Sequence, residues 1–248
     1  MFRQSANTLR MHLGDLDTVT WNSLDQYHLA EFKAFLNFSF DTRLLHAASD
    51  CWSINHHVFR FNGVELCPLF EEFEGILGKP YQSNAPIALP AAYNRTPESL
   101  AGFFGVTLGH LLPCMEGQSL LTLPLLKLGN SKPKGCKSWQ RIVSFYLYAH
   151  FLLISTEGRG STQIVQVLEQ VENGHNPFPI ILAETIVGLD SVKHTQRLRG
   201  SPLLLQVCIS FTSYACFPEP KLIYFSKKTD LAEGKAGRID APSQPYDV

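Results

Sequence analysis

The sequence lacks most of the features that point directly to a class of function. Charged residues make up only 17% of the 248 residues and the formal net charge is −1, which argues against a strongly basic nucleic-acid binder or an acidic tail protein. The N-terminal residues contain no apolar run of the kind that directs secretion. The longest apolar run, around 142–154, is too short to cross a bilayer and contains His150. We therefore expect a nuclear or cytoplasmic protein without membrane contact.

Regularly spaced cysteines are also missing. The six cysteines form no C-x-x-C pair, which favours reduced thiols over a disulfide framework. Cys51, His56, His57 and Cys67 are the right residue types for zinc, but their spacing matches no recurrent zinc finger. We expect no metal site and no cofactor.

Motifs for covalent catalysis and phosphate binding are absent as well. The chain has no G-x-S-x-G elbow, and its GRGS segment at 158–161 lacks the lysine of a phosphate-binding loop and follows a predicted helix. The sequence therefore predicts no catalytic residue and a protein that is not an enzyme.

What is present is a series of apolar stripes at helical spacing. They predict a mainly α fold, a single multi-helix, bundle-like domain over 24–216, preceded by a loose segment at 1–23 and followed by a polar, unfolded tail at 217–248. The first helix is predicted over about 24–38. The segment 139–155, WQRIVSFYLYAHFLLIS, is apolar on nearly every face and predicts the central helix.

Capping residues mark several helix starts. Asp41 precedes the TRLLHAASDCW helix, Thr96-Pro97 precedes SLAGFF, Asn176-Pro177 precedes a helix with a stripe from Ile181 to Leu189, and Ser201-Pro202 opens the last helix. The STEGRGS segment is predicted to be a loop before a helix that ends near Gly174.

The stretch VFRFNGVELCPLFEEFEGILG at 58–78 predicts a hairpin followed by a helix. Asn62-Gly63 suits a tight hairpin turn, so the hairpin is placed near 57–66. Pro68 fits the first helical position, and Gly78 can end the helix in a left-handed conformation. Glu71, Glu72 and Glu74 then lie near the positive end of the helix, where carboxylates are stabilising.

Two other groups of charged residues offer alternatives. Lysines and an arginine surround Trp139 and could contact phosphates while the ring stacks on bases; they are Lys127, Lys132, Lys134, Lys137 and Arg141. A second basic cluster lies at 193–199. The carboxylates of Glu71, Glu72 and Glu184 are the candidates for acid–base chemistry, if a cleft gathers them.

The order of these pieces resembles a known family. LLHAASDCW, VFRFNGVEL and PLFEEFEGILG are similar to the signature region of the plant mobile domain proteins, and more closely to a related plant-specific family of uncharacterised domains found near retroelements. WQRIVSFYLYAHFLLIS is similar to the central apolar helix of that family, and NPFPIILAETIVGLDSV and GSPLLLQVCIS to its later segments. The resemblance covers about residues 30–212.

The resemblance implies a helical, nuclear protein related to transposable elements, without established catalytic residues. Its motif positions are expected to be structural, and they are Trp52, Phe59, Phe61, Glu65, Pro68, Glu71, Glu72, Gly78, Trp139, Asn176, Pro177, Pro179 and Glu184. Some relatives carry the label aminotransferase-like, but no Schiff-base lysine is distinguishable here. We expect a non-enzymatic protein-interaction module with an unidentified protein partner. The alternatives are a nucleic-acid-binding module and an enzyme that uses Glu71, Glu72 or Glu184; the alternative location is the cytoplasm.

Overall fold

The computed structural model describes residues 13, 16–35, 41–61, 63–78, 84–91, 94–153, 158–195 and 199–216. These residues form a mainly helical fold with two three-stranded antiparallel sheets, which confirms the predicted fold class. Within them, no helix is long and apolar enough to cross a membrane. The predicted tail at 217–248 lies outside the described residues.

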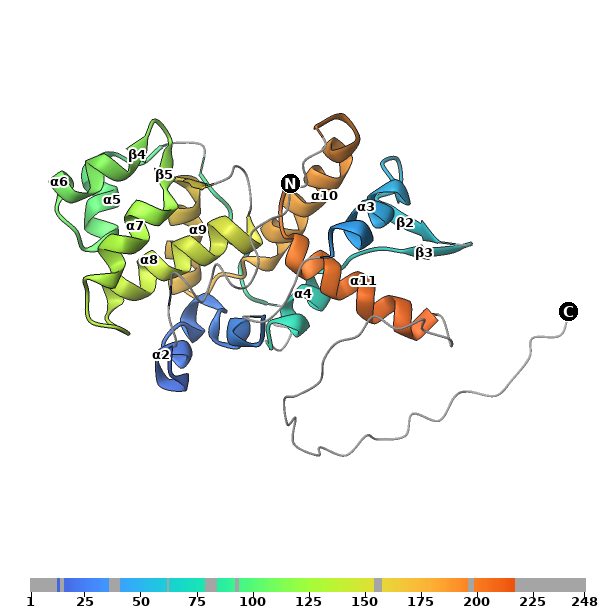
Figure 1. Cartoon of the computed structure of the whole chain (residues 1–248), viewed down its shortest axis with the longest axis horizontal. Helices are drawn as coiled ribbons and strands as arrows, with labels where there is room; N and C mark the ends of the chain where they lie inside the picture. The colour runs from blue at the N-terminus through green and yellow to red at the C-terminus, as the bar shows by residue number, and fades with distance from the viewer. Residues whose placement is uncertain are drawn as a thin grey trace, which may run out of the picture.

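The main core surrounds one helix, α8 (Lys137–Leu147), which continues into a π-helical turn, η4 (Tyr148–Leu152). Every residue from Ile142 to Leu152 is buried. Three helices lie around it, α5 (Pro97–Phe104), α7 (Thr122–Asn130) and α9 (Gln163–Glu172) (Figure 1). The prediction of a central apolar helix is therefore confirmed over 139–152; Leu153 follows the helix, and residues 154 and 155 lie outside the described residues.

The prediction of one helix over 24–38 is wrong. The chain instead forms α2 (Thr18–Asn22) and two 3-10 turns, η1 (Asp25–Tyr27) and η2 (Ala30–Phe35). His28 separates the two turns with a φ of 58°, a left-handed conformation that a continuous right-handed helix cannot contain. Trp21 of α2 is only 2% exposed, so the packed structure already includes part of the segment expected to be loose.

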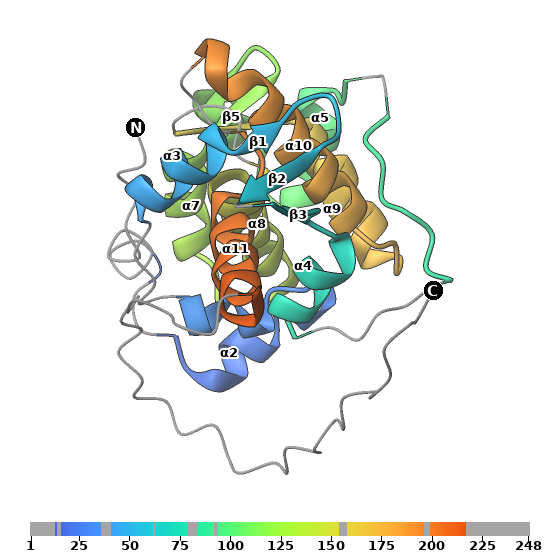
Figure 2. The same cartoon turned by 90° about the vertical axis from the view of Figure 1, so that its right-hand side faces the viewer.

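A second, smaller core lies between α3 (Thr42–Asp50), the first sheet, α10 (Phe178–Thr195) and α11 (Pro202–Cys216). The sheet consists of β1 (Trp52–Ser53), β2 (Val58–Phe61) and β3 (Val64–Leu66) in sequence order (Figure 2). The predicted hairpin is confirmed, with Phe61 opposite Val64 and Gly63 at a φ of 86°. Asn62 lies outside the described residues.

The helix after the hairpin, α4, spans Phe70–Ile76. It begins two residues later than predicted, so Pro68 precedes the helix instead of occupying its first turn. The side chain of Glu72 accepts a hydrogen bond from the Leu69 N–H at 3.0 Å, which satisfies one of the unpaired donors at the helix start. Gly78 follows the helix with a φ of 70°, as predicted.

The second sheet was not predicted. It consists of β4 (Met115–Glu116), β5 (Ser119–Leu121) and β6 (Arg159–Ser161), and β6 lies in the segment that was expected to be a loop. A Cβ atom on Gly160 would lie 2.7 Å from the Phe145 ring and 2.8 Å from Ala149 Cβ. The glycine therefore lets this edge strand lie directly on the central helix.

The remaining elements are α6 (Leu108–Leu111) and the 3-10 turn η3 (Leu112–Cys114). The predicted caps of α10 and α11 are present. Asn176 Oδ1 accepts from the Phe178 N–H at 2.9 Å, and Ser201 Oγ accepts from the Leu204 N–H at 3.2 Å. Asp41 and Thr96 cap α3 and α5 in the same way. These four predicted helix starts are confirmed.

Candidate functional site

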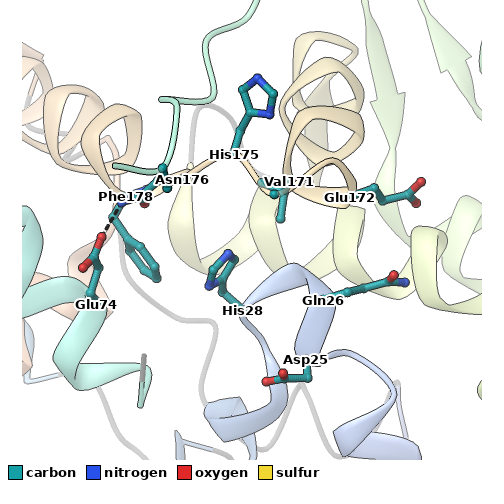
Figure 3. A pocket seen from close by; sticks show the side chains of 11 residues that line it. Asp25, Gln26, His28, Glu74, Val171, Glu172, His175, Asn176 and Phe178 are labelled. Atoms are coloured by element: carbon teal, nitrogen blue, oxygen red, sulfur yellow. Dashed lines mark hydrogen bonds between the residues drawn. The ribbon is translucent and has the colours of Figure 1, made fainter. Parts of the chain in front are cut away.

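A cavity of about 320 Å³ opens between η1, α4 and the α9–α10 junction (Figure 3). Its exposed rim includes Asp25, Gln26 and Gly174. Its buried wall is formed by Glu74, Val171, Asn176 and Phe178. His28, Ala85, Glu172 and His175 complete the described lining. This volume is at the lower end of the range of about 300–1,000 Å³ that is usual for ligand sites.

Glu74 supplies a carboxyl group to the buried wall. Its side chain is only 2% exposed, and its Oε1 accepts a hydrogen bond from Asn176 Nδ2 (Figure 3). Among the described residues, Oε2 has no hydrogen-bond partner. Burial raises the pKa of Glu74; the bond from Asn176 opposes the rise and the charge of Glu71 adds to it. An incompletely satisfied interior carboxyl is costly and calls for an explanation.

Glu172 lies at the other side of the cavity and is fully bonded. Its two oxygens accept from Arg141 Nε and Nη2, both at 2.6 Å. Tyr27 Oη donates to Oε1, and Lys137 Nζ lies 3.4 Å from Oε2. Burial alone would raise the pKa of Glu172, but the hydrogen bonds from Arg141 and Tyr27 outweigh it and the pKa is lowered. This carboxylate is a structural partner for a largely buried arginine.

Arg141 is held on all sides by this arrangement. Its guanidinium group lies 4.4 Å from the centre of the Phe103 ring and donates to the Phe103 carbonyl at 2.7 Å. The side chain is 18% exposed. Arg141 therefore joins α8 to α5 and α9 and is not presented to an external phosphate.

Asn176 is positioned by an extended segment, 84–91, that runs along α9. The Asn176 N–H donates to the Pro86 carbonyl at 2.7 Å, and the Ala88 N–H donates to the Asn176 carbonyl at 2.8 Å. Gln170 and Gln166 of α9 accept from the N–H groups of Leu89 and Ala91. With its backbone and amide both engaged, Asn176 holds Glu74 in place, and its side-chain amide donates to only one of the two Glu74 oxygens.

Two histidines lie at the cavity but differ in orientation. The His28 ring packs edge-on against Phe178, with centroids 5.5 Å apart, and Figure 3 shows it between Glu74 and Glu172. The His175 ring points to the opposite side from His28. The cavity thus combines one aromatic wall, two imidazoles and three carboxyl groups, without a lysine, arginine, serine, threonine, cysteine or tyrosine among the described lining residues.

The carboxylates proposed from the sequence are not gathered in this cavity. Glu71 and Glu184 are exposed. Glu72 caps α4 and accepts from the Cys208 thiol at 3.0 Å, and Glu65 pairs with Arg60 across the hairpin at 2.8 Å. The interpretation of Glu71 and Glu72 as residues of the first helical turn agrees with the structure.

Packing leaves only part of the basic cluster around Trp139 accessible to a nucleic acid. Trp139 is 1% exposed, so its ring cannot stack on a nucleic-acid base, contrary to the role considered for it. Lys137 and Arg141 both contact Glu172. Lys134 is exposed and Lys132 half-buried, and these two remain the candidates for phosphate contact.

The aromatic motif residues lie in the second core. Trp52 and Phe59 pack at a centroid distance of 4.7 Å, and Phe61 stacks on Phe59 at 5.9 Å. Trp52 Nε1 donates to Asp190 Oδ1 at 2.8 Å, joining the sheet to α10. Pro177 is buried and Pro179 half-buried at the start of α10.

The cysteine and histidine residues considered for zinc do not assemble. Among the described residues, no three His, Cys, Asp or Glu side chains are placed to hold a metal ion together. His57 instead lies 3.2 Å from Asp190 and stacks on Trp52, and His56 is 3.1 Å from Ser53 Oγ.

Sequence reasoning missed Glu74, although a signal was present. Glu74 was grouped with Glu71 and Glu72 at the helix end. It is, however, four residues after Phe70 and one after the fully buried Phe73, so helical spacing puts it on the inward face. His28 gave no such signal, because its conformation breaks the expected helix.

Comparison of the chain with protein-family models, with curated proteins and with solved structures finds no match.

Proposed function

We propose that this chain is a non-enzymatic binding module and that a protein partner inserts a side chain into the cavity at Glu74. The observation that carries the proposal is the Glu74 carboxyl, buried in the cavity wall with one oxygen lacking a partner among the described residues. Buried polar groups that are left incompletely bonded and have a shifted pKa concentrate at functional sites.

The composition of the lining supports binding over covalent chemistry. The described lining residues include no hydroxyl, thiol or amine nucleophile, and of the three carboxyl groups that of Glu172 is held by Arg141. The volume of about 320 Å³ suits one side chain or a small molecule. A single anchoring side chain in a well-packed pocket is a common centre of a protein interface.

The nuclear location and the relation to transposable elements are proposed from the resemblance of the chain to the plant mobile domain family. A fluorescent fusion expressed in plant cells tests the location. Accumulation in the nucleus is expected, and a signal confined to the cytoplasm would contradict this part of the proposal.

Affinity capture tests the binding function. The full chain is used as bait in a plant nuclear extract beside two variants, Glu74→Gln at the cavity and Glu184→Gln on the exposed face of α10. We expect proteins that are retained by the wild type and by Glu184→Gln and lost with Glu74→Gln. Equal recovery with all three baits would count against the cavity as the binding site.

The raised pKa of Glu74 favours a second candidate, general acid catalysis. A carboxyl group that holds its proton more tightly than an ordinary glutamate can donate it to a leaving group. Hydrolysis of model esters or glycosides that disappears in Glu74→Gln but not in Glu184→Gln would support this candidate. No turnover by the wild type would leave the binding function as the sole proposal.

A further inference from the structure

The charge of the cavity lining is one-sided. Asp25, Glu74 and Glu172 contribute carboxyl groups, whereas the described lining contains no lysine or arginine and its basic side chains are those of His28 and His175. The charge of Glu172 is offset by Arg141 and Lys137, neither of which belongs to the described lining. A group that enters the cavity therefore meets the negative potential at Glu74, which repels anions.

The second oxygen of Glu74 also lacks a hydrogen-bond donor among the described residues. Asn176 Nδ2 is bonded to Glu74 Oε1, and Asn176 Oδ1 is occupied by the Phe178 N–H. Within the described residues nothing donates to Glu74 Oε2. Because a carboxylate forms its strongest hydrogen bonds with charged N–H donors, a cationic group is the complement that this end of the cavity is missing.

The wall beside Glu74 is aromatic and apolar. Phe178 and Val171 are 1% and 3% exposed and line the same cavity. Such a surface accommodates the aliphatic stem of a lysine or arginine, and an aromatic ring attracts a cation over its face. A bare metal ion fits poorly, because among the described residues no three ligating side chains converge.

We infer that the cavity binds an organic cation, an ammonium or guanidinium group that donates to Glu74 while its stem lies along Phe178 and Val171. Oε2 is covered in the structure, so the carboxyl group must rotate about its last bond, which is a soft torsion in glutamate. This inference rests on the proposed binding function and specifies the ligand class of the same site. The cation comes either from a basic side chain of a protein partner or from a free small amine.

Calorimetric titration of the purified full chain with four probes tests the inference. The probes are a capped Gly-Ser peptide with one arginine, the same peptide with lysine, the arginine peptide with citrulline in place of arginine, and agmatine. Citrulline keeps the shape of arginine but is neutral. We expect binding of the arginine or lysine peptide, weakened at least about tenfold by citrulline. Agmatine that binds as tightly as the peptide would identify a small amine as the source.

Variants locate the binding. Glu74→Gln should weaken the binding of the cationic probes at least about tenfold, and Glu184→Gln should leave it unchanged. The citrulline comparison is made on the wild type, so it stands even if Glu74→Gln fails to fold. Equal affinity for arginine and citrulline, or no binding of any cation, would overturn the inference. If a partner is still captured in a Glu74-dependent way, the binding function survives and only the ligand class is wrong.

Discussion

The two glutamates of the cavity have opposite surroundings, although both are largely buried. Glu172 accepts hydrogen bonds from Arg141 and Tyr27 and has Lys137 nearby. Glu74 accepts one from a neutral amide, and its second oxygen has no partner among the described residues. Their pKa values are accordingly shifted in opposite directions, lowered for Glu172 and raised for Glu74.

The comparison separates a structural carboxylate from one suited to binding. A buried ion pair is expensive to break, because the remaining charge is left without a partner. A buried carboxyl without a full set of donors weakens the fold and is explained if a ligand completes it. The same residue type therefore supports stability at one side of the cavity and, in our proposal, recognition at the other.

The largest effect is expected for Glu172→Gln. This change removes the charge that balances the buried Arg141 and should lower the free energy of unfolding by about 3 kcal/mol. Urea denaturation followed by circular dichroism measures it. The matched control is Glu65→Gln, which breaks an exposed pair with Arg60 and should cost at most about 1 kcal/mol. Equal losses of unfolding free energy in the two variants would show that the Glu172 pair stabilises the fold no more than an exposed ion pair does.

Tyr27→Phe tests the contribution of the uncharged hydrogen-bond donor to Glu172. Tyr27 is fully buried and its hydroxyl donates to Glu172. Loss of a hydrogen bond to a charged group should cost about 1.5–3 kcal/mol and raise the pKa of Glu172. Thermal melts at neutral pH provide the measurement, and a variant as stable as the wild type would show that Arg141 alone holds the carboxylate.

Glu74→Gln, in contrast to the two changes above, should raise the free energy of unfolding near neutral pH. Since the pKa of Glu74 is raised above its usual value of 4.5 in the folded protein, the folded state binds this proton more tightly than the unfolded state. Its contribution to stability is therefore fully present below about pH 4.5 and lost as the pH rises through the folded-state pKa. The neutral amide avoids that loss.

We accordingly expect Glu74→Gln to be more stable than the wild type by about 1 kcal/mol at pH 7–8, with a difference that shrinks toward pH 4.5. Urea denaturation at a series of pH values checks both parts, with Glu184→Gln as the exposed control. A variant that is less stable than the wild type at pH 7–8 would mean that Glu74 is paired in the folded protein.

The smallest effect is expected for Asn176→Ser. Serine can still cap α10, but it no longer donates to Glu74 Oε1. Stability should fall by about 0.5–1 kcal/mol, and the pKa of Glu74 should rise further because the one bond that opposes the rise is gone. An unchanged pKa would show that Asn176 does not influence the carboxyl group.

The sequence predicted the features of the fold that depend on local contacts. Asp41, Thr96, Asn176 and Ser201 cap helices with bonds to residues two or three positions away, and such bonds leave a residue pattern. The second sheet left none, because β6 joins β5 only after some 40 residues and depends on Gly160 packing against Phe145. Its strands are also too short for a period of two to appear.

The site was harder to predict than the fold. The cavity is assembled from η1, α4 and the α9–α10 junction, which are far apart in the chain, and from a histidine in a left-handed conformation. Glu74 could be recognised as inward-facing from its spacing after Phe70. That its carboxyl group would meet Asn176, and that Glu172 would take Arg141, follows only from the packing of α4 against α10 and of α8 against α9.

The central claim is that the pKa values of the two cavity glutamates are shifted in opposite directions, and nuclear magnetic resonance tests it most directly. In protein labelled with ¹³C at the glutamate carboxyl carbons, the signals of Glu74 and Glu172 are assigned from their loss in the two glutamine variants and followed with pH. We predict a Glu74 pKa above 4.5 and a Glu172 pKa below it. Titration of both at the same pH, or in the reverse order, would contradict the account.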